Sequence, residues 1–240
     1  MKLPAIKGII DRRILINFRI DPDVMAHNLP SPFRPKLVRG YAIGGICLIR
    51  LKAARPTFLP LPWGMGSENA AHRIAVQWDV DGQEREGVYV PRRDTDSRVS
   101  TLVGGRLFPG TQHYAAFTVD ESADKLSVTL CSDDGVTQLH VSATVAESVP
   151  ESSVFSSLAE ASAFFEAGSL GYSATVEASR FDGLELRCKN WHVYALAIDE
   201  VVSSYFEDEA RFPIDSVMLD CGLLMRGIDH EWHGRELILS

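Results

Sequence analysis

Short segments in which apolar and polar residues alternate run through most of this chain of 240 residues. Between Ile14 and Ile20 every second residue is apolar, and the segment 72–80 repeats the pattern. A period of two residues is typical of strands that bury one face. The run 42–51 is almost continuously apolar, which predicts a strand buried on both faces. We therefore expect a fold built mainly of β-strands.

Turn residues separate the expected strands. Asp81-Gly82 predicts a two-residue hairpin turn before the strand 87–90, and we expect Pro91 to end that strand. A meander of three strands is predicted from the segments 114–119, 125–131 and 139–145.

Helical signals are fewer. The segment 152–168 carries the clearest one, with an apolar stripe and Gly168 at its C-terminal end. Asp21-Pro22 predicts the start of a short helix, because proline is favoured at the first helical position. A short helix or turn is also expected at 97–107, and a short helix at 199–206.

About a dozen strands with two or three peripheral helices, and no linker-like stretch, predict a single domain over residues 1–240. The fold class is mainly β (β-rich α+β), as a closed antiparallel β-barrel or cone. A sheet that closes on itself has an interior, and an interior of this size can hold a small molecule.

Charge and targeting signals exclude several classes of partner. The chain has 32 acidic and 24 basic side chains, a formal net charge of −8, which argues against a nucleic-acid partner. We find no apolar run of the roughly 18 residues that a membrane span needs and no signal-peptide core, so we expect a cytoplasmic protein without membrane contact. The sequence leaves open a homo-oligomer.

Metals and cofactors are not expected. The four scattered cysteines are interpreted as reduced thiols, since they form no CxxC pair: Cys47, Cys131, Cys188 and Cys221. His230 and His233 lie three residues apart but lack a third ligand at suitable spacing, so an exposed tail is favoured over a metal site. The glycines form no nucleotide-binding pattern.

Several stretches resemble a known family. They are the run Ile-Asn-Phe-Arg-Ile-Asp-Pro-Asp-Val at 16–24, the segments 40–42 and 67–69, and the helix and tyrosine segment at 157–172. They are similar to a bacterial family of unknown function whose members resemble acetoacetate decarboxylase in fold. The resemblance covers roughly 12–225. It implies a closed β-barrel or cone with outer helices and an internal pocket, but it supplies no reaction, because fold does not imply function.

A missing lysine separates this chain from the decarboxylase that it resembles. That enzyme forms a Schiff base between a lysine and its substrate, and the resemblance places the lysine in the segment 104–114. The chain has six lysines and 18 arginines, and none of the lysines lies between Lys52 and Lys125. We therefore expect any reaction to avoid a Schiff base.

Candidate catalytic residues come from two places in the expected pocket. Glu68 and His72 form a carboxylate and imidazole pair suited to proton transfer, and the alternative is a strand-end ion pair beside a partly exposed histidine. His113 and Tyr114 follow the Pro-Gly turn, where the related enzymes place their nucleophile. We expect His113 to be catalytic and Tyr114 to bind substrate, with ordinary strand packing as the alternative.

Arginines supply the candidate substrate-binding groups, because a guanidinium binds a carboxylate or phosphate in bidentate fashion. Positive charge is concentrated at Arg92, Arg93, Arg98 and Arg106. We predict substrate contacts from Arg73, Arg92 and Arg106. The alternative is charge compensation by Asp94 and Asp96.

Three functions fit these observations. The first is an enzyme of lyase or hydrolase type that acts on a small carbonyl or carboxylate compound without a Schiff base. The second is a non-catalytic carrier or sensor of a small apolar or anionic metabolite, and the third is a structural oligomerisation module. If all the candidate side chains face solvent, the enzyme hypothesis is rejected. If apolar side chains fill the cavity, both the enzyme and the carrier hypotheses are rejected.

Overall fold

A computed structural model describes residues 5–58, 64–103, 110–177 and 179–239. Within these ranges the chain forms the following strands: β1 (Ile6–Ile20), β2 (Arg34–Pro35), β3 (Leu37–Val38), β4 (Tyr41–Pro56), β5 (Met65–Val80), β6 (Gln83–Thr95), β7 (Gln112–Glu121), β8 (Lys125–Ser132), β9 (Gln138–Ala146), β10 (Leu170–Ala174), β11 (Arg180–Cys188), β12 (Tyr194–Ser203), β13 (Val217–Gly234) and β14 (Ile238–Leu239). The helices are α1 (Pro22–Asn28), α2 (Arg98–Val103) and α3 (Leu158–Ala167). No helix in these ranges is long and apolar enough to cross a membrane.

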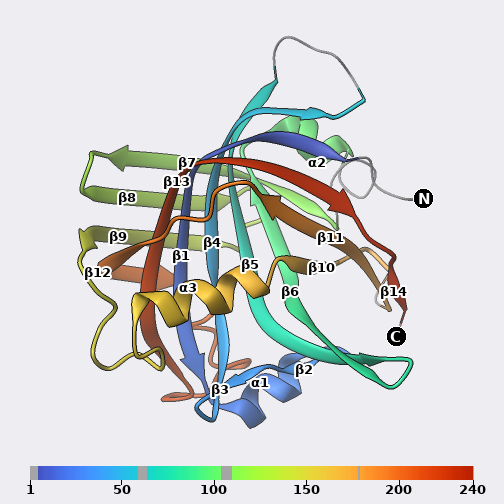
Figure 1. The fold of residues 1–240 in the computed structure, drawn as a ribbon, viewed down its shortest axis with the longest axis vertical. Helices are drawn as coiled ribbons and strands as arrows, with labels where there is room; N and C mark the ends of the chain where they lie inside the picture. Colours follow the sequence, from blue (N-terminus) through green and yellow to red (C-terminus); the bar gives the residue numbers. More distant parts are fainter. Residues whose placement is uncertain (1–4, 59–63, 104–109, 178, 240) are drawn as a thin grey trace.

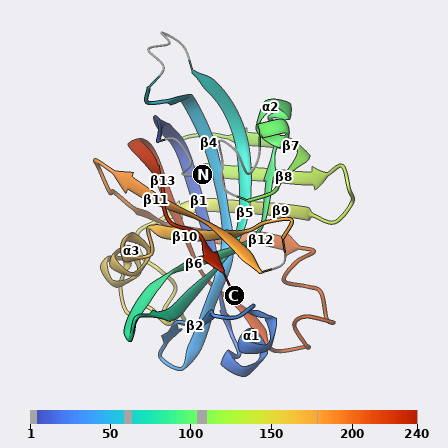
Figure 2. The ribbon, with the colours of Figure 1, turned by 90° about the vertical axis from the view of Figure 1, so that its right-hand side faces the viewer.

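The strands form one large sheet that closes on itself (Figures 1 and 2). A ring of seven strands runs β13-β1-β4-β5-β6-β10-β11 and returns to β13. A second path leaves β6 through β7, β8, β9 and β12 and also returns to β13. The strands from β13 to β6 are therefore common to both paths, and we call them the shared sheet. The closed β-rich fold that the sequence predicts is confirmed, but the sheet is mixed, because β6 pairs in parallel with both β10 and β7.

Both faces of the shared sheet are buried, and β1 shows why. Ile14 and Ile16 pack into a core against β7, β8 and β9, whereas Leu15 packs into a second core with α3. Figure 1 shows α3 crossing in front of β13, β1 and β4. All three side chains are fully buried, and burial of an aliphatic side chain of this size contributes about 1.5–3 kcal/mol. The predicted strand 42–51 is likewise buried on both faces.

Pro91 does not end its strand, contrary to the prediction, because β6 changes partner there. The outer edge of β6 pairs with β10 at residues 88–90 and with β7 at residues 93–95. Its pairing with β5 also shifts register between His72 and Ile74, opposite this point. A proline lacks the N–H that a continuous ladder needs, so it fits at a bulge between two partners.

Of the next three local predictions, two are confirmed and one is wrong. Asp21 caps α1 by accepting from the backbone of Asp23 and Val24, and the three-strand meander is present as β7, β8 and β9. The helix expected at 199–206 is wrong, since β12 continues to Ser203 in a ladder with β9.

Two further segments differ from the prediction, one at the start of α3 and one near the end of β13. The clearest predicted helix begins at Leu158 rather than near 152, because the Ser157 hydroxyl accepts from the backbone N–H of Glu160 and so caps it there. The segment 230–233 is part of β13 instead of an exposed tail, and His230 is only 3% exposed.

Candidate functional site

A cavity lies on the α3 side of the shared sheet, between that sheet and strands β10 and β11. Two of its adjoining sections contain about 680 and 640 Å³ of space free of protein atoms, a figure that includes open solvent at their mouths. They share the following lining residues: Cys47, Ile49, Ala71, Arg93, Leu184 and Trp232. A third section, beside α3, adds Lys36 and shares Arg13, Arg73, Val88, Phe165 and Gly168 with the second. We call the three together the arginine cavity.

Strand register brings four of the lining side chains to one face of the shared sheet. Cys47 of β4 lies opposite Ala71 of β5, and Ala71 lies opposite Arg93 of β6. Such cross-strand neighbours have Cβ atoms about 5 Å apart. Arg73 stands two residues after Ala71 and so projects to the same side. Arg13 of β1 and Arg73 line the same section of the cavity as Cys47.

Arg73 is the most deeply buried of these arginines, at 5% exposure. It donates a hydrogen bond to Oδ1 of Asn17, while its Nε has no partner among the described residues. Its guanidinium carbon lies 4.5 Å from the centroid of the Phe165 ring, a cation–π arrangement. Burial lowers the pKa of Arg73 to about 10, so the side chain remains a cation at neutral pH.

The Arg73 contact depends on a glycine in the neighbouring strand. Gly45 lies between Asn17 and Arg73 in the ladder. A Cβ at Gly45 would collide with the carbonyl oxygen of Ile16 and lie 3.3 Å from Oδ1 of Asn17. Asn17 is held from its other end, since its Nδ2 donates to the carbonyl of Cys221 at 3.1 Å. Gly45 therefore leaves the gap across which the two side chains meet.

Arg13 and Arg93 are also cations without a carboxylate partner in the described part of the chain. Arg13 Nε donates to Sγ of Cys47 at 3.4 Å, its guanidinium carbon lies 5.7 Å from the Trp191 ring centroid, and its Nη1 is buried without a partner. Arg93 Nε donates to the hydroxyl of Ser173 at 2.9 Å. Burial lowers the pKa of Arg93 to about 10, which again leaves it charged at neutral pH.

Other charged groups on the described lining are neutralised by neighbours. Asp94 is paired with Arg92 at 2.8 Å. Lys36 is paired with Glu86 at 2.7 Å, with its Nζ 4.8 Å from the centroid of the Phe164 ring. Burying a charge without a partner is unfavourable, so three arginines without counter-ions create a strongly positive cavity suited to an anion.

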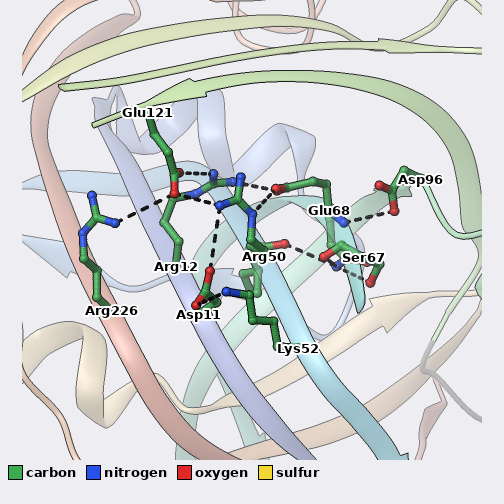
Figure 3. A network of polar contacts seen from close by, with 11 residues as sticks. Asp11, Arg12, Arg50, Lys52, Ser67, Glu68, Asp96, Glu121 and Arg226 are labelled. Carbon is green, nitrogen blue, oxygen red and sulfur yellow. Dashed lines mark hydrogen bonds and ion pairs between the residues drawn. The ribbon is translucent and has the colours of Figure 1, made fainter. Parts of the chain in front are cut away.

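Glu68 lies on the opposite face of the shared sheet, in a network of charges that Figure 3 shows. Its carboxylate binds Arg12 and Arg50, each at 2.6 Å, and both arginines also bind Glu121 at 2.7 Å. Arg12 is completely buried, and the carboxylates of Glu68 and Glu121 neutralise its charge. The network ties β1, β4, β5 and β7 together, and Asp11 extends it to Arg50 at 3.8 Å.

His72 shares that face but lies four residues from Glu68 along β5, which corresponds to about 13 Å. The structure therefore does not bring the predicted proton-transfer pair together. The His72 ring packs on Tyr205 with centroids 4.6 Å apart, and neither ring nitrogen has a partner among the described residues. Burial, with smaller contributions from the charges of Arg92 and Arg211, lowers the pKa of His72 to about 3.

The remaining predicted site residues lie near one another but outside the arginine cavity. Asp134 pairs with Arg92 at 2.9 Å and with His113 at 3.2 Å. Arg92 and His113 line another hollow, which shares Arg93 with the arginine cavity. Hydrogen bonds from Ser132 and Arg92 keep the pKa of Asp134 far below its ordinary value, although burial opposes them. Tyr114 packs under Arg98, whose guanidinium carbon is 4.6 Å from the ring centroid.

Arg106 lies outside the described residues. Of the predicted substrate-binding arginines, the structure places Arg73 in the cavity. The prediction missed Arg13 and Cys47, and it grouped Arg93 with Arg92 although the two project to opposite faces. The sequence does contain a signal for Arg13. Arg12 and Arg13 are consecutive in a strand buried on both faces, so one of the two charged side chains must enter each core.

One known protein family matches most of the chain. The family DUF2071, described as an uncharacterized conserved protein, matches residues 10–213. The sequence has no significant match among curated proteins.

Solved structures of similar fold include enzymes. Acetoacetate decarboxylase from Legionella pneumophila superposes with a TM-score of 0.60 at 10% identity, over 99% of this chain and 88% of that one. The enduracididine biosynthesis enzyme MppR, complexed with pyruvate, gives 0.58 at 12% identity, over 100% and 91%. An acetoacetate decarboxylase-like enzyme from Sphingomonas wittichii gives 0.57 at 12% identity, over 100% and 93%. At these identities the likeness is one of fold.

Proposed function

Because the chain belongs to the DUF2071 family and has the fold of acetoacetate decarboxylase-like enzymes, we propose that its arginine cavity binds a small carboxylate compound. The observation that carries the proposal is the set of three cavity arginines, Arg13, Arg73 and Arg93, which have no carboxylate partner among the described residues. A guanidinium and a carboxylate form two parallel hydrogen bonds, and exclusion of water strengthens them.

The rest of the lining favours a small ligand with an apolar portion. Ile49, Leu184, Trp191 and Trp232 face the same space as the arginines. A pocket of mostly apolar walls with a few convergent polar groups is typical of small-molecule sites. A neighbour of the same fold is complexed with pyruvate, which makes a short 2-oxo acid the first compound to test.

We further propose that any reaction in this cavity proceeds without a Schiff base. On its described lining, the lysine is Lys36, and its Nζ is engaged in an ion pair with Glu86 at 2.7 Å. A Schiff base requires a neutral amine as the nucleophile.

Calorimetric titration with pyruvate tests the proposal. We expect binding by the wild type, at least tenfold weaker binding of the uncharged pyruvamide, and at least tenfold weaker binding of pyruvate by Arg73→Met and Arg93→Met, since a hydrogen bond to a charged group contributes about 1.5–3 kcal/mol. Arg187→Met removes an exposed arginine paired with Glu185 and serves as the matched control. Equal binding of pyruvate and pyruvamide, or undiminished binding by both cavity variants, would contradict the proposal.

A non-catalytic carrier or sensor is the second candidate, and the position of Glu68 and His72 favours it. Both lie on the face of β5 away from the cavity, so neither can reach a ligand held by Arg73. Incubation of the protein with pyruvate and with acetoacetate, followed by NMR of the small molecules, separates the two. Loss of either compound supports an enzyme, and binding without turnover supports a carrier.

A further inference from the structure

Cys47 occupies the centre of the arginine cavity. It is 5% exposed and lines both of the larger sections. Its sulfur accepts a hydrogen bond from Arg13 Nε at 3.4 Å, and Ala71 alone separates it from Arg93 across the sheet. Cys47 is itself buried, but it lines a cavity that opens to solvent, and positively charged surroundings of this kind are typical of reactive cysteines.

The other three thiols lie in different surroundings. Cys221 is buried, and burial raises its pKa to about 12. Burial also raises the pKa of Cys188, and Cys131 is exposed on β8. None of these three belongs to the lining of the cavity sections described above.

A second observation shows that the space beside Cys47 is built for a ligand. Arg73 lines the same section, is nineteen-twentieths buried, and has a charge without a counter-ion and an Nε without a partner in the described residues. One carboxylate takes up one guanidinium fork. Because three cationic groups surround the cavity, positive charge remains available for a second oxygen that becomes negative during a reaction.

We propose that Cys47 is a nucleophile that adds reversibly to the keto carbon of a 2-oxo acid held by the arginines, and this inference rests on the proposed function. The sulfur forms a bond to the keto carbon, the π bond of the carbonyl breaks, and its electron pair goes to the carbonyl oxygen. The thiol proton ends on that oxygen, which gives a hemithioketal whose only charge is that of the carboxylate held by the arginines. The addition needs no oxidant, reductant or further reactant, and its reversal releases the intact acid.

Charge-selective alkylation tests whether Cys47 reacts beside the arginines. Native full-length protein is treated with iodoacetate or iodoacetamide, and each cysteine is quantified by peptide mass spectrometry. We expect the ratio of iodoacetate to iodoacetamide labelling at Cys47 to exceed that at Cys131 by at least tenfold, and Arg13→Met to reduce it. Equal ratios at the two cysteines, or no labelling of Cys47 by either reagent, would overturn the inference.

NMR with [2-¹³C]pyruvate tests the addition itself. We expect a new signal from a carbon bonded to both oxygen and sulfur, present with the wild type and absent with Cys47→Ser. Lactate has the same carboxylate without a keto group, so it is expected to slow alkylation of Cys47 without forming an adduct. Calorimetric binding of pyruvate without this signal would overturn the role of Cys47 and leave the proposed function standing. Absence of pyruvate binding would overturn both.

Discussion

Acidification should destabilise this fold in part through the imidazole of His72, which is buried in the core between the shared sheet and β7, β8 and β9. His72 is 1% exposed, and its ring packs on Tyr205 at 4.6 Å and faces Phe206 at 6.0 Å. Neither nitrogen has a described partner that could hold a proton. Burial, followed by the charges of Arg92 and Arg211, lowers the pKa of His72 from 6.5 to about 3.

The direction of the effect follows from which state binds the proton first. The unfolded chain protonates this histidine near pH 6.5, whereas the folded protein does so only near pH 3. The stability contributed by neutral His72 is therefore complete above pH 6.5 and is lost as the pH falls toward 3. At pH 5 the loss is about 2 kcal/mol, because each pH unit below 6.5 corresponds to about 1.4 kcal/mol.

Urea unfolding at pH 7.5 and 5.0 measures this loss. His230, whose pKa burial lowers to about 4, contributes a similar loss at pH 5 in all variants. His72→Leu should therefore reduce the fall in unfolding free energy between the two pH values by about 2 kcal/mol relative to wild type. Ile74→Val, in the same core, should lower stability by about 0.5–1.5 kcal/mol at both pH values alike.

The reasoning is refuted if His72→Leu shows the same pH dependence as the wild type. In that case the folded protein would accept the proton as readily as the unfolded chain, and the ring would have access to water or to an acceptor. A variant that is less stable at pH 7.5 but has a flatter pH dependence would still agree, because packing and titration are separate contributions.

The remaining predictions concern the two faces of the shared sheet. Gly45→Ala should lower both the free energy of unfolding and the affinity for pyruvate, since its Cβ would displace the Ile16 backbone and the Asn17 amide that holds Arg73; unchanged calorimetric binding would contradict this. Arg12→Met should lower the free energy of unfolding by about 1–3 kcal/mol in urea titrations, because Glu68 and Glu121 each lose one of the two arginines that bind them, while Arg50 remains. Arg73→Met should leave stability unchanged or raise it while it weakens pyruvate binding, and a loss of stability as large as that of Arg12→Met would show that Arg73 is structural.

Much of the fold follows from the sequence because its signals are local. The alternation from Ile14 to Ile20 identifies β1, and Asp21 and Pro22 identify the start of α1. Partner choice is not local. Nothing in the residues around Pro91 indicates that β6 exchanges β10 for β7 there, since both pairings join segments distant in the chain.

The site is harder to predict because it depends on register. A slip of one residue would exchange the faces of a strand, so Arg92 and Arg93 are interchangeable in a sequence-based argument. In the structure Arg93 enters the cavity and Arg92 pairs with Asp94. Alternation alone correctly places Glu68 and His72 on one face, but it does not show that the face is the one away from the cavity.

Arg12 and Arg13 allow the two faces to be compared directly, because they are consecutive residues of one strand. The fold pairs Arg12 with Glu68 and Glu121, which is how a protein normally accommodates a buried guanidinium. Arg13, in contrast, contacts the thiol of Cys47 and the indole ring of Trp191, and no carboxylate among the described residues pairs with it. The chain has 32 acidic side chains against 24 basic ones, so a shortage of carboxylates does not explain the difference. An unpaired charge lowers stability, and residues retained at such a cost are typical of functional sites. The unpaired arginines are therefore better explained by an anion that completes the cavity than by the needs of folding.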